Sequence, residues 1–440
     1  MAFGLMCIYI FLSFVRILDL YPELANLRLM LILGQGCLVI SFIEWGMTQR
    51  KKRASFREVQ VWLTVIFFML AIFGWARIGW WDEAIDSFNK LNIILGGFVM
   101  LVINLTNLKR LKKLVIVFVV SCVIMTTQGM AAYYYNWQRD LFVLEWHPPE
   151  DNPDAQPDPD EKPDPPRIRN LGFLNDPNDL AQTLAMAVPL IAVAWEKKRR
   201  ARNWCLLFPV GAYLLFGIFL THSRGGLVAV AVMILMALRE RIGKIKAGIL
   251  TTCMITVALV FNVTGGRAMK DESSEARIEA WASGIIMLRQ NPVFGVNYGN
   301  FSEAHGRGIT AHNSFVLCFA EMGLVGYFVW MSLLTTSYIE FQRLIKFPVQ
   351  DEEDLEIRDW ARGVRLAFTT FLAAAFFLSR TYILTLYMLI AFAICLEDIT
   401  RRKYPQYRPK RANVWAKHTL AWQLITIALV WIAVKANGGG

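Results

Sequence analysis

An arginine interrupts a long apolar tract within the sequence Thr-His-Ser-Arg-Gly-Gly at 221–226. A charge in the middle of a bilayer costs roughly 2.5–3.5 kcal/mol. Arg224 must therefore either lie at a membrane surface or have a function that justifies this cost. Basic clusters at 197–200 and 239–246 flank the two apolar tracts, which places the clusters on the cytoplasmic side and Arg224 on the outer side. A guanidinium beside the N-terminus of a following helix favours a phosphate group, whereas a positioning charge at a helix end is the plainer interpretation.

Further arginines are predicted at the same outer surface. Arg277 lies four residues before Trp281 in an amphipathic segment, so the two side chains can share one helix face. Arg380 lies between two apolar tracts. Two or more arginines at one surface would bind a pyrophosphate, because each planar guanidinium can grip two oxygens. A solvated helix charge is the alternative for Arg277, and other arginines of the same segment compete for the role: Arg267, Arg289 and Arg307.

A histidine precedes another apolar tract in the sequence Ala-His-Asn-Ser at 311–314. The imidazole of His312 has a pKa near neutrality, so it can accept a proton from a hydroxyl nucleophile. The alternative is a hydrogen-bonded residue at a helix start, where Asn313 or the following serine would supply the cap. His222, beside Arg224, and His305 are the other outer histidines that could act as the base.

Two acidic features have plainer interpretations. Glu321 lies inside the apolar tract after His312, where a carboxylate is expensive, and we interpret it as a structural partner of a buried polar group. The sequence Asn-Asp-Pro-Asn-Asp at 175–179 opens another tract from the outer side. It is typical of a helix cap, and binding a sugar or a metal is the alternative.

The composition identifies a membrane protein. Hydrophobic residues make up 55% of the 440 residues, which excludes an ordinary soluble domain. Many apolar tracts approach the ~20 residues that cross a bilayer, so we predict an all-α, polytopic integral membrane protein with about 12–13 transmembrane helices. The predicted spans are 3–20, 26–45, 59–79, 91–107, 114–134, 176–195, 204–221, 226–239, 247–264, 314–338, 365–379, 381–397 and 419–435.

The loops between these spans agree with one orientation. Alternating the spans places every basic cluster on the cytoplasmic side and the N-terminus inside. The net charge of +11 is therefore mostly a topology signal, and basic residues scattered among inner loops give no indication of nucleic-acid binding. The first apolar run is typical of a transmembrane helix rather than a cleaved signal peptide.

We divide the chain into five parts. The outer loop 135–175 contains an acidic, proline-rich stretch that predicts an extended spacer. The outer loop at 265–313 contains an amphipathic helix at 275–289, which ends at Asn291-Pro292 before turns at Gly295, Gly299 and Gly306. The parts are 1–134 (N-terminal transmembrane helices), 135–175, 176–264 (transmembrane helices with the Ser-Arg-Gly turn), 265–313 (a large outer catalytic loop) and 314–440 (C-terminal transmembrane helices and basic inner loops).

The ordered set of motifs resembles the superfamily of O-antigen ligases and O-antigen polymerases. The resemblance covers about residues 170–340, and the rest of the chain agrees in its hydrophobic layout. It rests on the stretches 173–181 and 221–226, the pair Arg277 and Trp281, and the stretches 291–301, 311–315 and 321–326.

The resemblance implies glycan transfer at the periplasmic face of the bacterial inner membrane, from an undecaprenyl-diphosphate-linked donor. Arg224 and Arg277 would engage the diphosphate, and His312 would be the base for an acceptor hydroxyl. No metal or other cofactor is implied, since arginines neutralise the diphosphate, and the transfer would invert the anomeric configuration. The expected substrate-binding residues are Arg224, Arg277, Arg380, His222, Asn313 and Trp281. The acceptor stays open among lipid A core, a growing glycan and a protein hydroxyl.

Two alternatives to a ligase remain. A polymerase of the same superfamily would join the glycan to a growing chain. A transporter, as some relatives have been labelled, should have broken helices and charges at mid-membrane in repeated halves. The polar residues singled out above cluster at the outer surface, which favours an enzyme.

Overall fold

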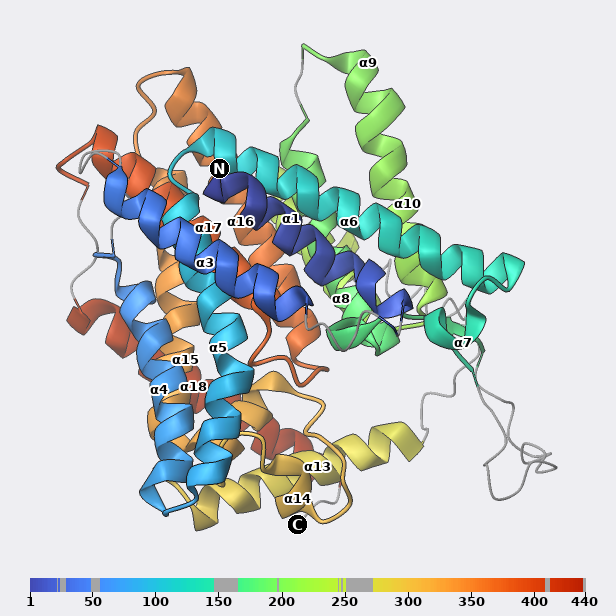
Figure 1. Ribbon diagram of the computed structural model, residues 1–440, viewed down its shortest axis with the longest axis vertical. Coiled ribbons are helices and arrows are strands. Elements are labelled where there is room, and N and C mark those ends of the chain that lie inside the picture. The colour runs from blue at the N-terminus through green and yellow to red at the C-terminus, as the bar shows by residue number, and fades with distance from the viewer. Residues whose placement is uncertain are drawn as a thin grey trace.

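The computed structural model is a helical bundle (Figure 1). It describes the chain except for residues 22, 24–28, 49–55, 146–164, 196–197, 244, 247, 251–271, 408–411 and 438–440. The predicted span 247–264 and the proline-rich stretch lie largely outside the described residues, as do Arg267 and the basic cluster at 50–53.

Helices cover all the other predicted spans. In the first part of the chain these are α1 (Ala2–Val15), α3 (Leu29–Met47), α4 (Val59–Arg77), α5 (Trp81–Asn104) and α6 (Leu108–Tyr135), with the short turn η1 (Ile17–Leu20). The middle part contains α7 (Arg139–Phe142), η3 (Gly172–Leu174), α8 (Pro177–Val193), α9 (Arg200–Arg202), η4 (Asn203–Leu207), α10 (Phe208–Leu220) and α11 (Arg224–Ile242). The last part contains α13 (Glu272–Gln290), α14 (Phe301–His305), α15 (Ser314–Lys346), α16 (Glu352–Ala375), α17 (Leu384–Lys403) and α18 (Ala412–Ala436).

The all-α polytopic membrane fold is confirmed. Among the described residues, 7 helices are long and apolar enough to cross a membrane, including the continuous run Arg200–Leu220. Several of the remaining predicted spans are shorter than the ~20 residues needed for a crossing, such as α1 with 14 residues and α8 with 17. The full number of crossings therefore stays a prediction.

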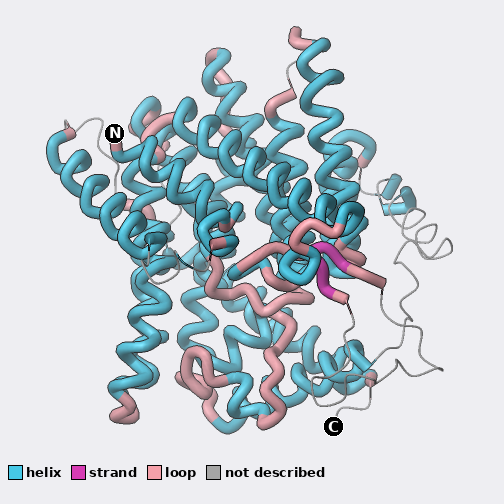
Figure 2. Tube along the Cα trace, turned by 45° about the vertical axis from the view of Figure 1, so that its right-hand side comes forward, coloured by secondary structure: helices cyan, strands magenta, loops and turns pink. Residues whose placement is uncertain are grey.

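One pair of very short strands is present in the described part of the chain (Figure 2). β1 (Val143–Leu144) and β2 (Arg167–Ile168) pair in antiparallel register, with Val143 opposite Ile168. They stand on either side of residues 146–164 in the sequence, so they hold the two ends of the acidic outer loop together.

α15 forms the centre of the bundle. In its most apolar stretch 83% of the residues are buried, against 11% for α3 and 22% for α18. It packs against α4, α13, α16, α17 and α18, whereas α3 and α18 present large apolar side chains outward, as a lipid-facing helix does.

The helix predicted at 275–289 is confirmed as α13, and it ends before Asn291 as expected. In Figure 1, α13 lies across the lower end of the bundle, transverse to α4 and α5. The turns predicted at Gly295, Gly299 and Gly306 are also confirmed, because all three residues have positive φ angles.

The sequence predicted an uninterrupted helix at 314–338, and the structure differs. α15 is broken at Gly323, where φ is 61° and ψ is −169°. The break leaves the carbonyls of Ala320 and Glu321 without their helical partners, Leu324 and Val325.

The loop after α13 replaces both lost hydrogen bonds. The amides of Val296 and Asn297 donate to the carbonyls of Ala320 and Glu321 at 2.9 and 3.0 Å. In return, the amides of Leu324 and Val325 donate to the carbonyls of Pro292 and Val293 at 2.8 and 3.3 Å. We call this contact between 292–297 and 320–325 the loop–helix junction.

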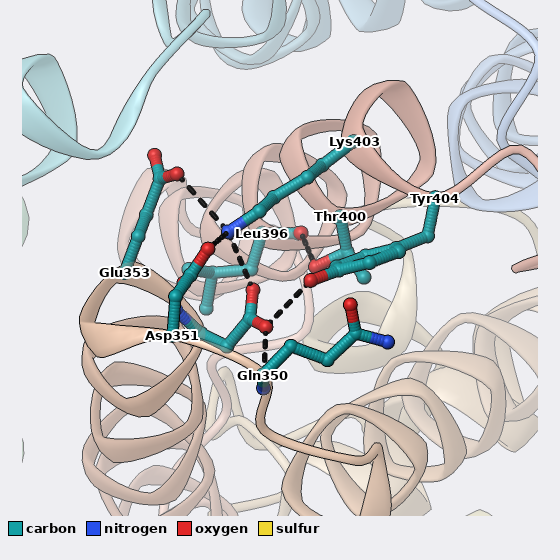
Figure 3. Close-up of polar contacts among 8 residues, drawn as sticks. Gln350, Asp351, Glu353, Leu396, Thr400, Lys403 and Tyr404 are labelled. Carbon is teal, nitrogen blue, oxygen red and sulfur yellow. Dashed lines mark hydrogen bonds and ion pairs between the residues drawn. The ribbon is translucent and has the colours of Figure 1, made fainter.

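Basic residues at the C-terminal end of α17 join neighbouring helices. Lys403 reaches Asp351 at 2.6 Å, Glu353 at 3.3 Å and Asp354 at 2.8 Å near the start of α16 (Figure 3). Arg401 pairs with Glu58 at 2.9 Å, just before α4. The basic cluster predicted as a topology signal therefore also ties helix ends together.

Candidate functional site

The starts of α8 and α11 are joined by one asparagine. The side-chain oxygen of Asn178 accepts hydrogen bonds from the Ser223 hydroxyl at 2.7 Å and from Arg167 at 3.1 Å. Arg167 also donates to the carbonyl of Thr221 at 2.8 Å. These contacts fix the turn that carries Arg224 against the start of α8.

The two glycines after Arg224 permit this close approach. A Cβ atom at Gly226 would lie 2.7 Å from the Cβ of Ala181 in α8, and one at Gly225 would lie 3.1 Å from Phe377, just beyond α16. Larger residues would push α11 away from both neighbours. The glycines therefore bring the half-buried Arg224 beside α8 and beside the segment that leads to Arg380.

Ser223 caps α11, since its hydroxyl oxygen accepts from the amide of Gly226 at 3.0 Å. One amide of the first turn is thereby used within the protein. Arg224 occupies the first helical position, where the positive end of the helix dipole and the guanidinium act together on an anion.

Hydrogen bonds attach the segment before α15 to the 376–383 loop. The Ser314 hydroxyl donates to the carbonyl of Leu378 at 2.5 Å and accepts from the amide of Arg380 at 2.8 Å. Thr381 donates to the carbonyl of Ser314 at 2.8 Å, and the hydroxyls of Thr310 and Ser379 lie 2.8 Å apart. His312 lies between these attachment points.

Two other predicted site residues, Arg277 and Arg380, influence the protonation of His312. Burial lowers the pKa of the imidazole below its usual value, and the positive charge of Arg277 lowers it further. Asp176 opposes this effect, and Arg380 adds to it. Arg277, Arg380 and the start of α8 therefore all lie within electrostatic range of His312, although they come from distant parts of the sequence.

The two arginines near His312 differ in their surroundings. Arg380 makes a two-pronged ion pair with Asp179, with its Nε 2.5 Å from one carboxylate oxygen and its Nη2 against the other. The Asp179 side chain is fully buried, which fixes the guanidinium of Arg380 in place. Arg277 is half-buried on α13. Its competitor Arg307 pairs with Glu279 at 2.6 Å, at an exposed position.

Asn313 and Trp281 fix the backbone on either side of His312. The side-chain oxygen of Asn313 caps α15 by accepting from the amides of Phe315 and Val316 at 2.9 and 3.2 Å. Its side-chain nitrogen is buried and has no hydrogen-bond partner among the described residues. The buried indole of Trp281 donates to the carbonyl of Ala311 at 3.0 Å, which anchors α13 to the segment before His312.

The other outer histidines occupy different settings. His222 is buried directly before the Ser223 cap, with its ring centre 5.7 Å from that of Phe219. His305 ends α14 and packs 6.2 Å from the ring of Phe301. Glu321 accepts from the backbone amide of Phe301 at 3.4 Å, which agrees with the structural role predicted for it.

The sequence reasoning missed three residues that build this site. Asp176 caps α8, as predicted for its motif, but its effect on His312 was not expected. The pairing of Asp179 with Arg380 spans 201 positions and leaves no local signal. Arg167 could have been found, because it is an arginine on the predicted outer side, the same signal that identified Arg224.

No group of three or more histidine, cysteine, aspartate or glutamate side chains in the described part of the chain is arranged to hold a metal ion. The positively charged groups around His312 are those suited to an anion, and the unpartnered amide of Asn313 can donate to an oxygen of a ligand.

Comparison with known proteins identifies a similar family. Residues 209–331 match a family model described as O-antigen ligase. The match includes Arg224, Arg277, Trp281, His312 and Asn313, and it ends before Arg380. A search of curated proteins found no match. Over residues 209–331 the chain is therefore similar to the O-antigen ligase family, which supports membership of the superfamily of O-antigen ligases and polymerases.

Proposed function

We propose that this protein transfers a glycan from an undecaprenyl-diphosphate-linked donor to an acceptor hydroxyl at the periplasmic face of the bacterial inner membrane. The observation that supports the proposal best is the electrostatic influence of Arg277 and Arg380 on His312, together with the pairing of Arg380 with Asp179 in α8. A proton acceptor beside fixed positive charges suits a reaction in which a hydroxyl attacks and a diphosphate leaves.

The arginines bind the donor in this proposal. Arg224 and Arg277 grip the diphosphate oxygens with their planar forks and neutralise the charge that grows on the leaving group. Arg380 is held by Asp179, which fixes the position of its guanidinium and compensates much of its charge. These side chains supply the charge that a divalent cation provides elsewhere, which makes the reaction independent of metal.

His312 acts on the acceptor. Its neutral imidazole takes the hydroxyl proton while the oxygen forms a bond to the anomeric carbon and the carbon–diphosphate bond breaks. The diphosphate leaves with the electron pair from the opposite side, so the configuration inverts. His222 and the side-chain nitrogen of Asn313 complete the polar lining, and Trp281 positions the His312 segment.

A polymerase reaction would use the same chemistry with a growing glycan as the acceptor. Lipid A core, a glycan and a protein hydroxyl all present the nucleophile that His312 would deprotonate. The choice between ligase and polymerase is therefore a choice of acceptor, and purified acceptors of each class distinguish the two.

The break in α15 is the feature that a transporter would share, because transporters bind ions at unwound helices. Here the four backbone groups next to the break bond to the loop at 292–297. They are therefore engaged within the protein, which supports a structural role for the break.

Replacing His312 tests the proposal. His312→Gln keeps a hydrogen-bonding side chain but cannot take the proton, so transfer should fall by about 10²–10⁴-fold while donor binding stays close to wild type. Transfer from the diphosphate-linked donor is measured in membranes that contain matched amounts of protein. His305→Gln, another histidine of the outer region, is the control and should transfer normally. Wild-type transfer by His312→Gln would show that the base lies elsewhere.

A further inference from the structure

A cavity of about 720 Å³ lies between α1, α3 and α5. Most of its lining is apolar, and three glycines, Gly34, Gly96 and Gly97, lie in its wall. Its volume is within the range of ~300–1,000 Å³ that is usual for ligand sites.

The polar lining is concentrated at one end. Arg16 and Asp19, which pair with each other at 2.6 Å, follow α1, and Lys90 lies in the first half of α5. The predicted orientation places the end of α1 and the start of α5 at the outer surface. Apolar residues such as Leu38 and Met100 line the cavity further along α3 and α5, towards the inner side. The charged end and the apolar remainder of the cavity therefore match an amphiphile whose headgroup lies at the predicted outer surface.

Two segments that line the cavity are adjacent in sequence to residues of the site around His312. Phe173 lines it three residues before Asp176, and the segment 382–384 lines it immediately after Arg380 and Thr381. A molecule whose charged group lies beside Arg380 could therefore extend its apolar part directly into this space.

A second apolar cavity, of about 630 Å³, lies between α15, α16 and α18. Its charged lining includes Arg343 and Lys346, at the inner end of α15. The charged end of this cavity lies on the side opposite to that of the first cavity. It therefore does not suit a lipid chain whose diphosphate lies at the predicted outer surface.

We infer that the cavity between α1, α3 and α5 holds the first isoprenoid units of the polyprenyl chain of the donor. This inference rests on the proposed function. All the residues that line the cavity lie outside 209–331, so the family match does not contain the site. The N-terminal helices would thus bind the lipid part of the donor, whereas the matched segment binds the diphosphate.

A phenylalanine at Gly96 tests the inference by filling the cavity. A Cβ atom at Gly96 would meet a single neighbour, Leu38, at 3.4 Å, so the backbone can accept the side chain. Gly36→Phe is the matched control, because Gly36 lies on α3 outside the cavity lining with nothing within 4 Å of its Cβ position. Each variant is assayed with a donor that has a long polyprenyl chain and with one that has only two or three isoprene units.

We expect Gly96→Phe to lower kcat/KM for the long-chain donor at least tenfold and to leave the short-chain donor unchanged, with both values normal in Gly36→Phe. Normal use of the long-chain donor by Gly96→Phe, or an equal loss with both donors, would overturn the inference.

Photocrosslinking separates this inference from the proposed function. A photoactivatable polyprenyl diphosphate should label α3 or α5 of the wild-type protein, and Gly96→Phe should abolish the label. Labelling in α3 or α5 by a protein that transfers from neither donor would refute the proposed function and keep the lipid site. Labelling confined to the α15–α18 cavity would overturn the inference.

Discussion

Two residues of the outer face share an unusual backbone conformation. His222 and His312 have φ angles of 47° and 48°, and each directly precedes the residue that caps the next helix. A left-handed conformation costs a non-glycine residue roughly 1–2 kcal/mol, and such residues cluster at functional sites. This conformation turns the chain sharply into α11 and α15, so each histidine lies just before the N-terminus of a helix that carries site residues.

The lowered pKa of His312 predicts the pH dependence of transfer. Because burial and Arg277 place the pKa below the usual value of about 6.5, the imidazole is neutral at pH 7 and can accept a proton. The kcat/KM for transfer should stay constant above pH 7 and fall as acid protonates His312. A bound diphosphate adds negative charge and stabilises the imidazolium, so the acid limb of kcat should lie at higher pH than that of kcat/KM. The prediction fails if His312→Gln retains the same acid limb.

Arg224 should not tolerate lysine. Arg224→Lys keeps the charge but loses the planar fork that grips two oxygens, so transfer should fall nearly as far as in Arg224→Ala. Transfer from the diphosphate-linked donor is compared at equal protein levels, with exposed Arg307→Lys as the control. Wild-type turnover by Arg224→Lys would exclude the diphosphate role.

At the scale of elements, the loop–helix junction depends on two glycines, each of which lies against the backbone of the opposite segment. A Cβ atom at Gly295 would lie 2.4 Å from the carbonyl oxygen of Ala320, and one at Gly323 would lie 2.4 Å from that of Val293. Both residues also have positive φ angles. Neither position therefore has room for a side chain or a backbone that suits one.

Gly323→Ala should destabilise the protein and impair transfer. The backbone angles of Gly323 lie in a region that is essentially restricted to glycine, which alone accounts for about 1–3 kcal/mol, and the clash with Val293 adds to it. The melting temperature in detergent is compared with that of Gly299→Ala, which also has a positive φ angle but has open space around its Cβ position. Equal melting temperatures for the two variants would show that the junction contributes nothing beyond strain.

The sequence predicted the elements better than their contacts. Hydrophobic periodicity identified α13, and the interruption of an apolar tract at Arg224 identified the turn between α10 and α11, because both signals are local. The break at Gly323 lies inside a continuous apolar run, and its hydrogen-bond partners are about 30 residues earlier in the chain. Likewise, the Asp179–Arg380 pair depends on how α8 and the 376–383 loop pack, which no local pattern contains.

At the scale of the whole molecule, the ends of the bundle that the topology predicts to be inner and outer differ in their contacts. The inner ends of α16 and α17 are joined by the ion pairs of Lys403, and Arg401 connects them to the start of α4. The outer ends carry the residues around His312 on four separate segments. Rigid inner connections of this kind fix how far apart those outer segments can stand.

Deleting residues 150–164 should leave transfer largely intact. The β1–β2 pair and the Arg167 contacts with Thr221 and Asn178 hold both ends of the deleted stretch in place. Closing the shorter loop changes the chain entropy only slightly, since that term grows slowly with length. Transfer and membrane insertion are both measured, and complete loss of transfer with normal insertion would show that this stretch takes part in the reaction.

The loop–helix junction also has a consequence for the order of biosynthesis. Residues 292–297 leave the ribosome before α15, so in the predicted topology they have reached the outer face by the time α15 enters the membrane. A broken helix in lipid would expose unpaired backbone groups, which is costly. The earlier segment supplies those partners as the later one arrives, so synthesis from the N-terminus allows α15 to bend without passing through an unsatisfied state.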